Sequence, residues 1–460
     1  MNRPRHPRRT SVHRRSTLVG GLVVVLVAAA ACVPPPPEPI AAVQMDPGAI
    51  GAFFSMPWPN DVRRAADGTL VLAGLPGVDL LPGVSPNPTR SRFPGIAAEI
   101  GRSLTGFGVN TAAYFGADLP LDPASVPAPS ASTSPGSPVL LMDLDHPGER
   151  VPVIVDVQQA ADRNRPSDII TVLPYPGHPL RQSTRYAVAL LDGLRLQSGQ
   201  RLLPAPLVAR LDEPRTADTG VDAATWDALR GQRDDVRAAL ASTTSWDPSH
   251  LVAFTEFTTQ DVRGDLHAVA DAVHESAPPA VQVLDQQPCA PDSRAGGRPT
   301  AALRGTVALT RWQAGTYPYD DAGGEIVVGT DGRAVPQGTF DAEFTARVPC
   351  GDPPPGGWPL LTVIDGTGGT YALGATIPPL ANEGYLIAEI GAVYGQGRGI
   401  VVTPLMQQLG ITTASAASQF TFYNFFNPDA ARTNTIQQTG ENLQLLDAME
   451  SLRDGDQAWS

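Results

Sequence analysis

Residues 358–399 read WPLLTVIDGTGGTYALGATIPPLANEGYLIAEIGAVYGQGRG, and this stretch decides the fold of the C-terminal part of the chain. An apolar run is followed by a glycine-rich turn, a helical segment and a second apolar run. Short apolar runs bounded by turn residues are typical of buried strands, and a helix between two of them is typical of α/β domains. The stretch therefore predicts an α/β domain.

The residues before this stretch extend the same sheet. Apolar and polar side chains alternate at 305–311, 325–329 and 339–348, and we interpret 303–348 as the antiparallel strands that begin it. This order of elements is that of the first half of an α/β-hydrolase core. The 460 residues contain no G-x-S-x-G, the turn that carries the nucleophile in that fold. We therefore expect an incomplete α/β-hydrolase domain over residues 287–460.

The N-terminal part has a different pattern. Residues 40–215 form short alternating segments separated by Pro, Gly, Asp and Asn, which is typical of an all-β sandwich. We predict a β-sandwich-like domain with two helices over residues 46–286, and thus a fold class of α/β plus all-β. The predicted strands are 138–144, 151–157, 169–173, 186–191 and 251–258, and the helices carry Trp226, Leu229, Val236 and Leu240, and Leu266, Val269 and Val273.

The first residues form an export signal. Six Arg in residues 1–16 precede an apolar run at 18–31, which is too short to cross a bilayer as a standard helix. The run ends in AAAC, which resembles a bacterial lipobox with Cys32 as the lipidated residue. We expect a signal peptide over 1–31, a Pro-rich linker over 32–45 and a cell-surface or membrane-anchored lipoprotein; the alternative is ordinary secretion.

The charge of the chain limits its partners. All 33 basic residues are Arg, and the formal net charge is −13. Residues 1–31 hold six of these Arg and no acid, so the remainder has a net charge of −19. We expect no nucleic acid partner, because such proteins carry basic surfaces. Membrane attachment would come from the lipid on Cys32 alone.

Two other cysteines follow. An exported chain meets oxidising conditions in which a pair of thiols usually closes. We predict a disulfide between Cys289 and Cys350; the alternative is two separate buried thiols. Neither cysteine has the neighbours of a nucleophile or the spacing of a metal site, and we expect no metal.

Three further segments carry a family resemblance. They are MPWPND at 56–61 followed by DGTL at 67–70, PLRQSTRYAVALLDG at 179–193, and FYNFFNPDAAR at 422–432, continued by Thr433, Asn434 and Gln437. In these segments the chain resembles the bacterial extracellular, virulence-factor type lipases, which are surface lipoproteins with a β-rich N-terminal domain before an α/β-hydrolase domain. The resemblance covers nearly the whole chain after residue 45.

The resemblance implies hydrolysis of carboxylic esters, including lipids, by serine acyl transfer without a cofactor. Because the triad order in this fold is Ser, acid, His, we expect the whole triad after Ser460 and no catalytic residue in this chain. The histidines agree, since they all precede residue 358. We interpret them as solvated or packed side chains.

One part of the catalytic site falls inside the chain. An oxyanion hole in this fold takes one backbone N–H from the loop after the third strand, which is DGTGG at 365–369. We expect Gly366 or Thr367 to be that donor, with glycines that adopt positive φ. Relatives resembling this chain usually have His where Asp365 stands, and an acid there opposes a developing negative charge. The alternative is a plain strand-to-helix turn.

The remaining polar and aromatic groups of the C-terminal part have structural interpretations. We expect Arg432 and Asn434, at the start of a helix reaching about residue 452, to have a structural role, such as holding the preceding Phe-rich loop; the alternative is contact with a substrate. The aromatic side chains of 420–426 belong to a core or line an acyl pocket, and 412–419 is a loop or cap helix. The competing functional hypothesis is a non-catalytic surface lipoprotein that binds a ligand or partner, motivated by Asp365 and the missing nucleophile turn.

Overall fold

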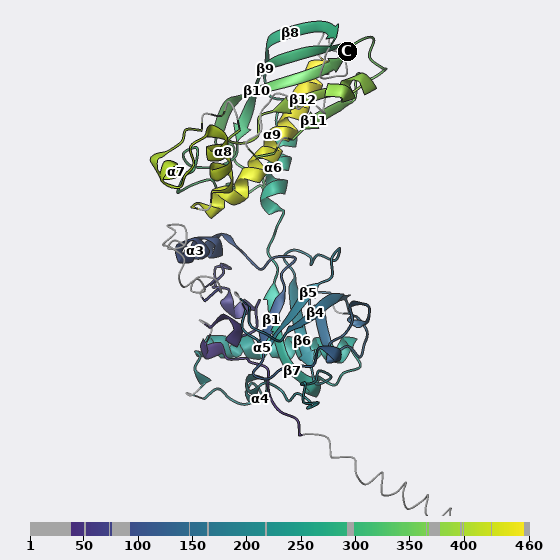
Figure 1. Cartoon of the computed structure of the whole chain (residues 1–460), viewed down its shortest axis with the longest axis vertical. Helices are drawn as coiled ribbons and strands as arrows, with labels where there is room; N and C mark the ends of the chain where they lie inside the picture. Colours follow the sequence, from purple (N-terminus) through teal and green to yellow (C-terminus); the bar gives the residue numbers. More distant parts are fainter. Residues whose placement is uncertain are drawn as a thin grey trace, which may run out of the picture.

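The computed structural model describes residues 38–49, 52–72, 74–75, 93–146, 148–162, 165–216, 219–291, 299–364, 366–367, 378–395, 398, 400–424 and 426–454. The predicted signal peptide and Cys32 lie outside them. The chain is a mixed α/β protein with several sheets, drawn in Figure 1 as two lobes.

The N-terminal lobe holds two antiparallel sheets, ordered β1-β5-β4 and β3-β2-β6-β7. Helix α5 covers the second sheet and contacts β7. The predicted strands and the helix around Trp226 are confirmed. The bounds are α3 Phe93–Ser103, β1 Ala113–Gly116, β2 Val139–Asp143, β3 Arg150–Val151, β4 Val153–Gln158, β5 Ile169–Pro174, β6 Arg185–Leu191, α4 Pro206–Arg210, α5 Ala223–Thr243 and β7 Leu251–Thr258.

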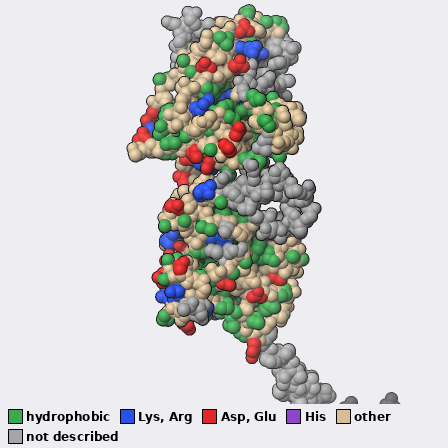
Figure 2. Space-filling view, turned by 90° about the vertical axis from the view of Figure 1, so that its left-hand side faces the viewer, with side chains coloured by type: hydrophobic (Ala, Val, Ile, Leu, Met, Phe, Trp, Pro, Cys, Tyr) green, Lys and Arg blue, Asp and Glu red, His purple; other side chains and the backbone are tan. Residues whose placement is uncertain are grey.

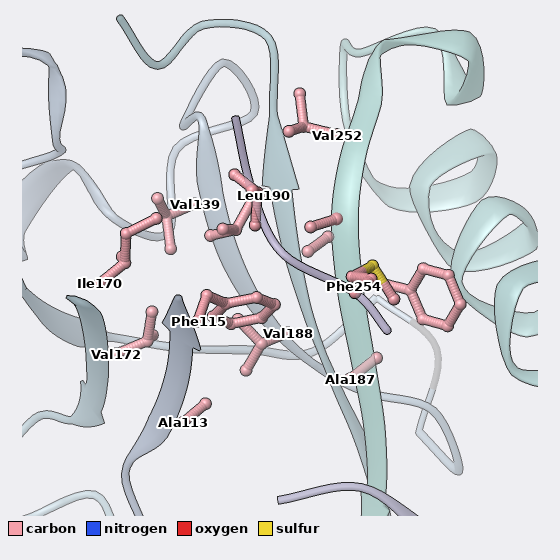
Figure 3. Close-up of a cluster of buried hydrophobic side chains, with 14 of the residues drawn as sticks. Ala113, Phe115, Val139, Ile170, Val172, Ala187, Val188, Leu190, Val252 and Phe254 are labelled. Atoms are coloured by element: carbon pink, nitrogen blue, oxygen red, sulfur yellow. The ribbon is translucent and has the colours of Figure 1, made fainter. Parts of the chain in front are cut away.

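A single apolar core fills this lobe. Phe115 of β1 and Ile170 of β5 lie beside Val139, Val188 and other side chains of the second sheet (Figure 3). Strand β2 is buried along its whole length, and β6 and β7 are buried at all but one end residue each. The second sheet is therefore an internal layer between the first sheet and α5, which explains apolar runs where a two-layer sandwich gives alternation.

The turn at 56–61 links several elements of this lobe. Asn60 is fully buried, and its Nδ2 donates to Thr255 Oγ1 at 3.0 Å while its Oδ1 accepts from Gln232 Nε2 at 3.1 Å. The Asp61 carboxylate accepts from the backbone N–H and the hydroxyl of Thr258, at 2.9 and 2.5 Å. These hydrogen bonds attach residues 56–61 to β7 and α5, so the role of this segment is structural.

The C-terminal lobe holds a five-stranded sheet ordered β11-β12-β10-β9-β8. Its strands β8 to β10 and β12 are joined by antiparallel pairings, and β11 and β12 are parallel. The bounds are α6 Gly264–Glu275, β8 Val281–Pro291, β9 Pro299–Arg311, β10 Gly338–Pro349, β11 Leu360–Val363, η9 Pro378–Glu383, β12 Leu386–Ile390, α7 Pro404–Gln408, α8 Ala414–Tyr423 and α9 Pro428–Asp454.

Helices cover both faces of this sheet. Alternate residues of β12 separate the faces, because Leu386, Ala388 and Ile390 pack with Leu445 and Met449 of α9, whereas Ile387 packs with Ala381 of η9. Figure 1 shows α9 running along the sheet beside α6. This alternation is the period-two pattern that the sequence displays.

The strand predicted at 325–329 is wrong, because this segment makes only isolated bridges, Gln313 with Ile326 and Val328 with Ala334. The expected domain boundary between residues 286 and 287 falls inside β8. Helix α6 already packs against α9, so the passage from one lobe to the other lies between β7 and α6.

The predicted disulfide is present. Cys289 of β8 and Cys350, which follows β10, are joined with a Cα–Cα distance of 5.9 Å and a sequence separation of 61. The bond links the two strands that flank β9. Closing a loop of this length contributes about 4 kcal/mol in the chain-entropy treatment.

Candidate functional site

Loops of the C-terminal lobe converge at one edge of its sheet. The parallel strands β11 and β12 both end there, and the antiparallel register brings the end of β9 and the beginning of β10 to the same edge. Ligands of open α/β sheets bind outside the carboxyl ends of the strands. A ligand site is therefore expected at this edge.

The loop after β11 carries the two oxyanion-hole candidates. Thr367 Oγ1 hydrogen-bonds to Tyr423 Oη, at the end of α8, over 3.2 Å. The space beside Gly366 is open, since a Cβ there would meet no atom within 4 Å, but its φ is not in the left-handed region. The expectation of positive φ is thus wrong at Gly366. Asp365 lies outside the described residues.

Exposed apolar side chains lie at this loop and on the segments that follow β12. Ile364 is 65% exposed and Tyr423 is 54% exposed. Val401, which is 75% exposed, follows Ile400, a residue that packs against the cluster containing Phe422. Single exposed apolar residues are ordinary, but Ile364 and Tyr423 lie at the same loop and provide an apolar contact surface there.

The aromatic segment at 420–426 divides between core and surface. Phe422 is buried with Tyr319 and Tyr394, and Phe420 stacks at a tilt on Phe426 with ring centroids 5.7 Å apart. Phe425 lies outside the described residues. Helix α8 covers residues 414–423, which agrees with the cap-helix interpretation.

The first turns of α9 hold the loops in place. Asn434 Nδ2 donates to the Phe422 carbonyl at 2.8 Å, so its predicted role is confirmed. Arg432 instead pairs with Asp265 of α6. The structural role expected of Arg432 is therefore met by an ion pair that joins two helices, and not by a contact with the Phe-rich loop.

A second loop, at 315–324, packs against the beginning of α9. The side-chain amides of Asn424 and Asn427 both donate to the Tyr319 carbonyl, at 2.8 and 3.0 Å. Gly324 has φ +97°, and a Cβ there would lie 2.6 Å from the Cβ of Ala430. Only glycine fits this contact, which fixes the tyrosines of the loop against the sheet edge.

A stack of rings and guanidinium groups lies beneath these loops. Tyr394 stacks on Tyr317 with centroids 5.3 Å apart, and Arg311 lies 5.0 Å from the Tyr317 ring and 5.5 Å from the Phe340 ring. Arg398 lies 4.9 Å from Phe340. Burial raises the pKa of Tyr317 to about 12, so this hydroxyl stays protonated and donates to the Arg398 carbonyl at 3.0 Å.

A buried ion pair closes the stack. Arg398 donates to both carboxylate oxygens of Glu441 on α9, at 3.2 and 2.7 Å, and the two side chains are 10% and 1% exposed. Burial alone would lower the pKa of Arg398, but the Glu441 carboxylate raises it above its ordinary value. The pair is a charged, two-pronged contact between the strand-end loop and α9.

These groups line a cavity of about 340 Å³. Its wall also includes the exposed Asp341 of β10 and two glutamines. Gln313, which follows β9, donates a hydrogen bond to α9, and Gln437 of α9 donates one to a carbonyl of β9. The volume is within the range of small-molecule sites. No residue of this cavity was a predicted site residue; Arg311, Tyr317 and Glu441 come from distant parts of the chain and were missed.

The described residues offer no serine triad. His146 lies 3.1 Å from Asp143 and His250 lies 2.8 Å from Asp192, both in the N-terminal lobe. Within the described ranges, no serine hydroxyl hydrogen-bonds to either imidazole. The interpretation of these histidines as structural or solvated groups agrees with these contacts.

Other site classes receive no support within the described ranges. These residues hold no group of three or more His, Cys, Asp or Glu side chains placed to bind a metal ion. None of their helices is both long and apolar enough to cross a bilayer. No family model and no curated protein matches the sequence.

Proposed function

We propose that the chain belongs to an exported lipoprotein of the lipase and esterase class, with a β-sandwich-like domain before the first part of an α/β-hydrolase domain. The observation that carries the proposal is the order of the C-terminal sheet. An α/β-hydrolase core begins with antiparallel strands, and the strand after its first crossover helix is inserted beside them. Here β12 lies between β10 and β11, which is that arrangement.

The faces of the sheet give a second line of support. The connection from β11 to β12 passes through η9 on one face, and the chain after β12 returns as α9 on the other face. Coverage of both faces is required for a parallel sheet to extend. The outer edge of β11 has no described partner strand, and the nucleophile strand of a hydrolase pairs there.

The chemistry proposed is attack on an ester carbonyl by a serine expected after Ser460. The loop after β11 would supply one oxyanion donor from Gly366 or Thr367. The apolar side chains of Ile364, Val401 and Tyr423 would contact the acyl part of an ester or lipid. Lipid on Cys32 would hold the protein at the membrane.

Nucleic acid is not a proposed partner. In the view of Figure 2, acidic side chains lie over both lobes with Arg interspersed, and the described residues of this face form no broad basic surface. The strongly negative charge of the chain after residue 31 agrees with this view.

The test compares the product of the whole gene with the chain ending at Ser460, both beginning at Cys32. We expect hydrolysis of p-nitrophenyl esters and labelling of one serine by a fluorophosphonate only in the longer protein. Circular dichroism and urea unfolding would establish that both are folded. Folded proteins of both lengths that neither hydrolyse esters nor take up the label would disprove the proposal.

The second candidate is a surface lipoprotein that binds a small ligand without hydrolysing it. The cavity around Arg311 favours it, because this cavity needs no nucleophile to function. Asp365 in the oxyanion loop favours it too. Ligand binding by a protein that fails the ester and label tests would select this candidate.

A further inference from the structure

The cavity at the sheet edge contains a cation with no acceptor. Arg311 is partly buried, and its guanidinium lies between the rings of Tyr317 and Phe340. Among the residues that the structure describes, no oxygen accepts a hydrogen bond from this guanidinium. Gln313, Arg398, Gln437 and Glu441 of the same wall are all hydrogen-bonded, so the Arg311 guanidinium differs from these neighbours.

The neighbouring groups are already satisfied. Arg398 has Glu441 and the Gly391 carbonyl as acceptors. Gln437 accepts from the Trp312 backbone N–H at 2.7 Å and donates to Glu441 at 2.9 Å. None of these side chains can turn to Arg311 without breaking a buried contact, which costs the desolvation of the group left behind.

We propose that this cavity binds a small organic carboxylate, with its carboxylate forked onto the Arg311 guanidinium and its apolar body against Val393 and the tyrosine rings. The planar guanidinium presents parallel N–H donors that match the two oxygens of a carboxylate. Contacts with the rings of Tyr317 and Phe340 hold the Arg311 guanidinium in one orientation, so little side-chain entropy is lost when a ligand binds.

The charges of the cavity favour a single negative charge on the ligand. Arg398 is neutralised by Glu441, which leaves Arg311 as the cation that an anion meets. The exposed Asp341 lies at the rim and opposes a second negative charge. A dianion such as phosphate is therefore disfavoured relative to a monocarboxylate. The site operates without a serine nucleophile, so the inference is independent of ester hydrolysis.

The test is binding of benzoate to the full chain, measured by ligand-observed NMR and calorimetry, beside benzamide and inorganic phosphate. Benzamide has the same shape and no charge, and we expect it to bind at least about tenfold more weakly. Phosphate should compete poorly. Benzoate that fails to saturate a folded protein, or phosphate that competes as well as benzoate, would overturn the assignment.

Variants locate the site. We expect Arg311→Gln to reduce benzoate binding to the level of benzamide, and Asp341→Asn to strengthen it by a few-fold. Arg304→Gln, on the same strand and outside the cavity, is the matched control for a lost charge and should bind as the unmodified chain does. Unaltered benzoate binding by a folded Arg311→Gln variant would contradict the proposal.

Discussion

Each lobe is stabilised internally by a different kind of contact. In the N-terminal lobe one continuous apolar cluster extends from the first sheet through the second sheet to α5. In the C-terminal lobe the apolar residues form several smaller clusters, and polar groups separate them. Apolar packing is tolerant of position, whereas hydrogen bonds require particular partners, so the second lobe fixes its loops more specifically.

Helix α9 shows this difference within one element. Its later part packs on the sheet through Leu445, Ala448 and Met449. Its earlier part presents Asn434, Gln437 and Glu441 to the loops at the sheet edge, each through a buried hydrogen bond or ion pair. The polar part lies where the candidate site is. The later, apolar part of α9 therefore supports the sheet, and its earlier, polar part positions the loops of the candidate site.

The largest expected effect is a break in the apolar lobe. Phe254 of β7 is fully buried in the cluster of Figure 3. Replacing it with Ala should lower the free energy of unfolding of this lobe by about 4 kcal/mol, because a cavity remains among tightly packed neighbours. Urea unfolding followed by hydrogen exchange and mass spectrometry measures each lobe separately. The exposed Val71→Ala is the control, and a loss below about 1 kcal/mol in Phe254→Ala would contradict a well-packed core.

The second effect breaks the polar part of α9. Glu441→Ala leaves Arg398 buried without its carboxylate, and we expect a loss of about 3 kcal/mol in the C-terminal lobe. Exchange protection should fall around 391–398 and in the first turns of α9 and stay unchanged in β6 and β7.

The double variant Arg398→Met with Glu441→Leu tests whether the unpaired charge of Arg398 causes this loss of stability. Removing both charges should restore most of the stability, because no unpaired charge remains. A double variant as unstable as Glu441→Ala would show that packing at these positions, and not the uncompensated charge, carries the effect.

The sequence predicted the apolar parts of the fold well. The strand at 251–258 has the predicted bounds, and the helix around Trp226 is α5, because long apolar patterns record burial directly. Strand β8 was missed because ten of its eleven residues are exposed, and its few apolar side chains at 281–284 are followed by polar residues and proline. No strand forms at 325–329, because the segment is a loop in which Ile326 and Val328 each form an isolated bridge to a different part of the chain.

The candidate site was only partly predictable. The loop holding Gly366 and Thr367 follows a strand and is rich in glycine, so its place at the sheet edge could be inferred. The cavity around Arg311 could not, since Arg311, Phe340 and Arg398 meet only after the register of β9, β10 and β12 is fixed. One arginine among 33 carries no signal in the sequence.

The apolar lobe also contains buried acidic side chains. Glu256 of β7 is buried, and burial, aided by Asp235, raises its pKa from 4.5 to about 7. Its folded pKa exceeds its unfolded pKa, so the protonated form is favoured by folding. The contribution is fully present below pH 4.5 and is lost as the pH rises to about 7.

Glu256→Gln should remove this pH dependence. At pH 8 the variant should exceed the unmodified chain in stability by about 2 kcal/mol, because the cost of a buried carboxylate disappears, with some loss from the weakened contact to Arg185. At pH 4 the two should agree closely. Unfolding in urea at both pH values measures the difference, and an equal difference at pH 4 and pH 8 would contradict the assignment to Glu256.

The smallest expected effect on stability concerns the exposed contact between Thr367 and Tyr423. Tyr423→Phe removes one hydroxyl from a solvent-exposed hydrogen bond, so the free energy of unfolding should change by less than about 0.5 kcal/mol. In the product of the whole gene, the same change frees the loop that would supply the oxyanion donor, and ester hydrolysis should fall by about tenfold in kcat. Tyr175→Phe, an exposed tyrosine of the N-terminal lobe, is the matched control. Equal activity of the two variants would mean that the contact between Thr367 and Tyr423 does not position the loop.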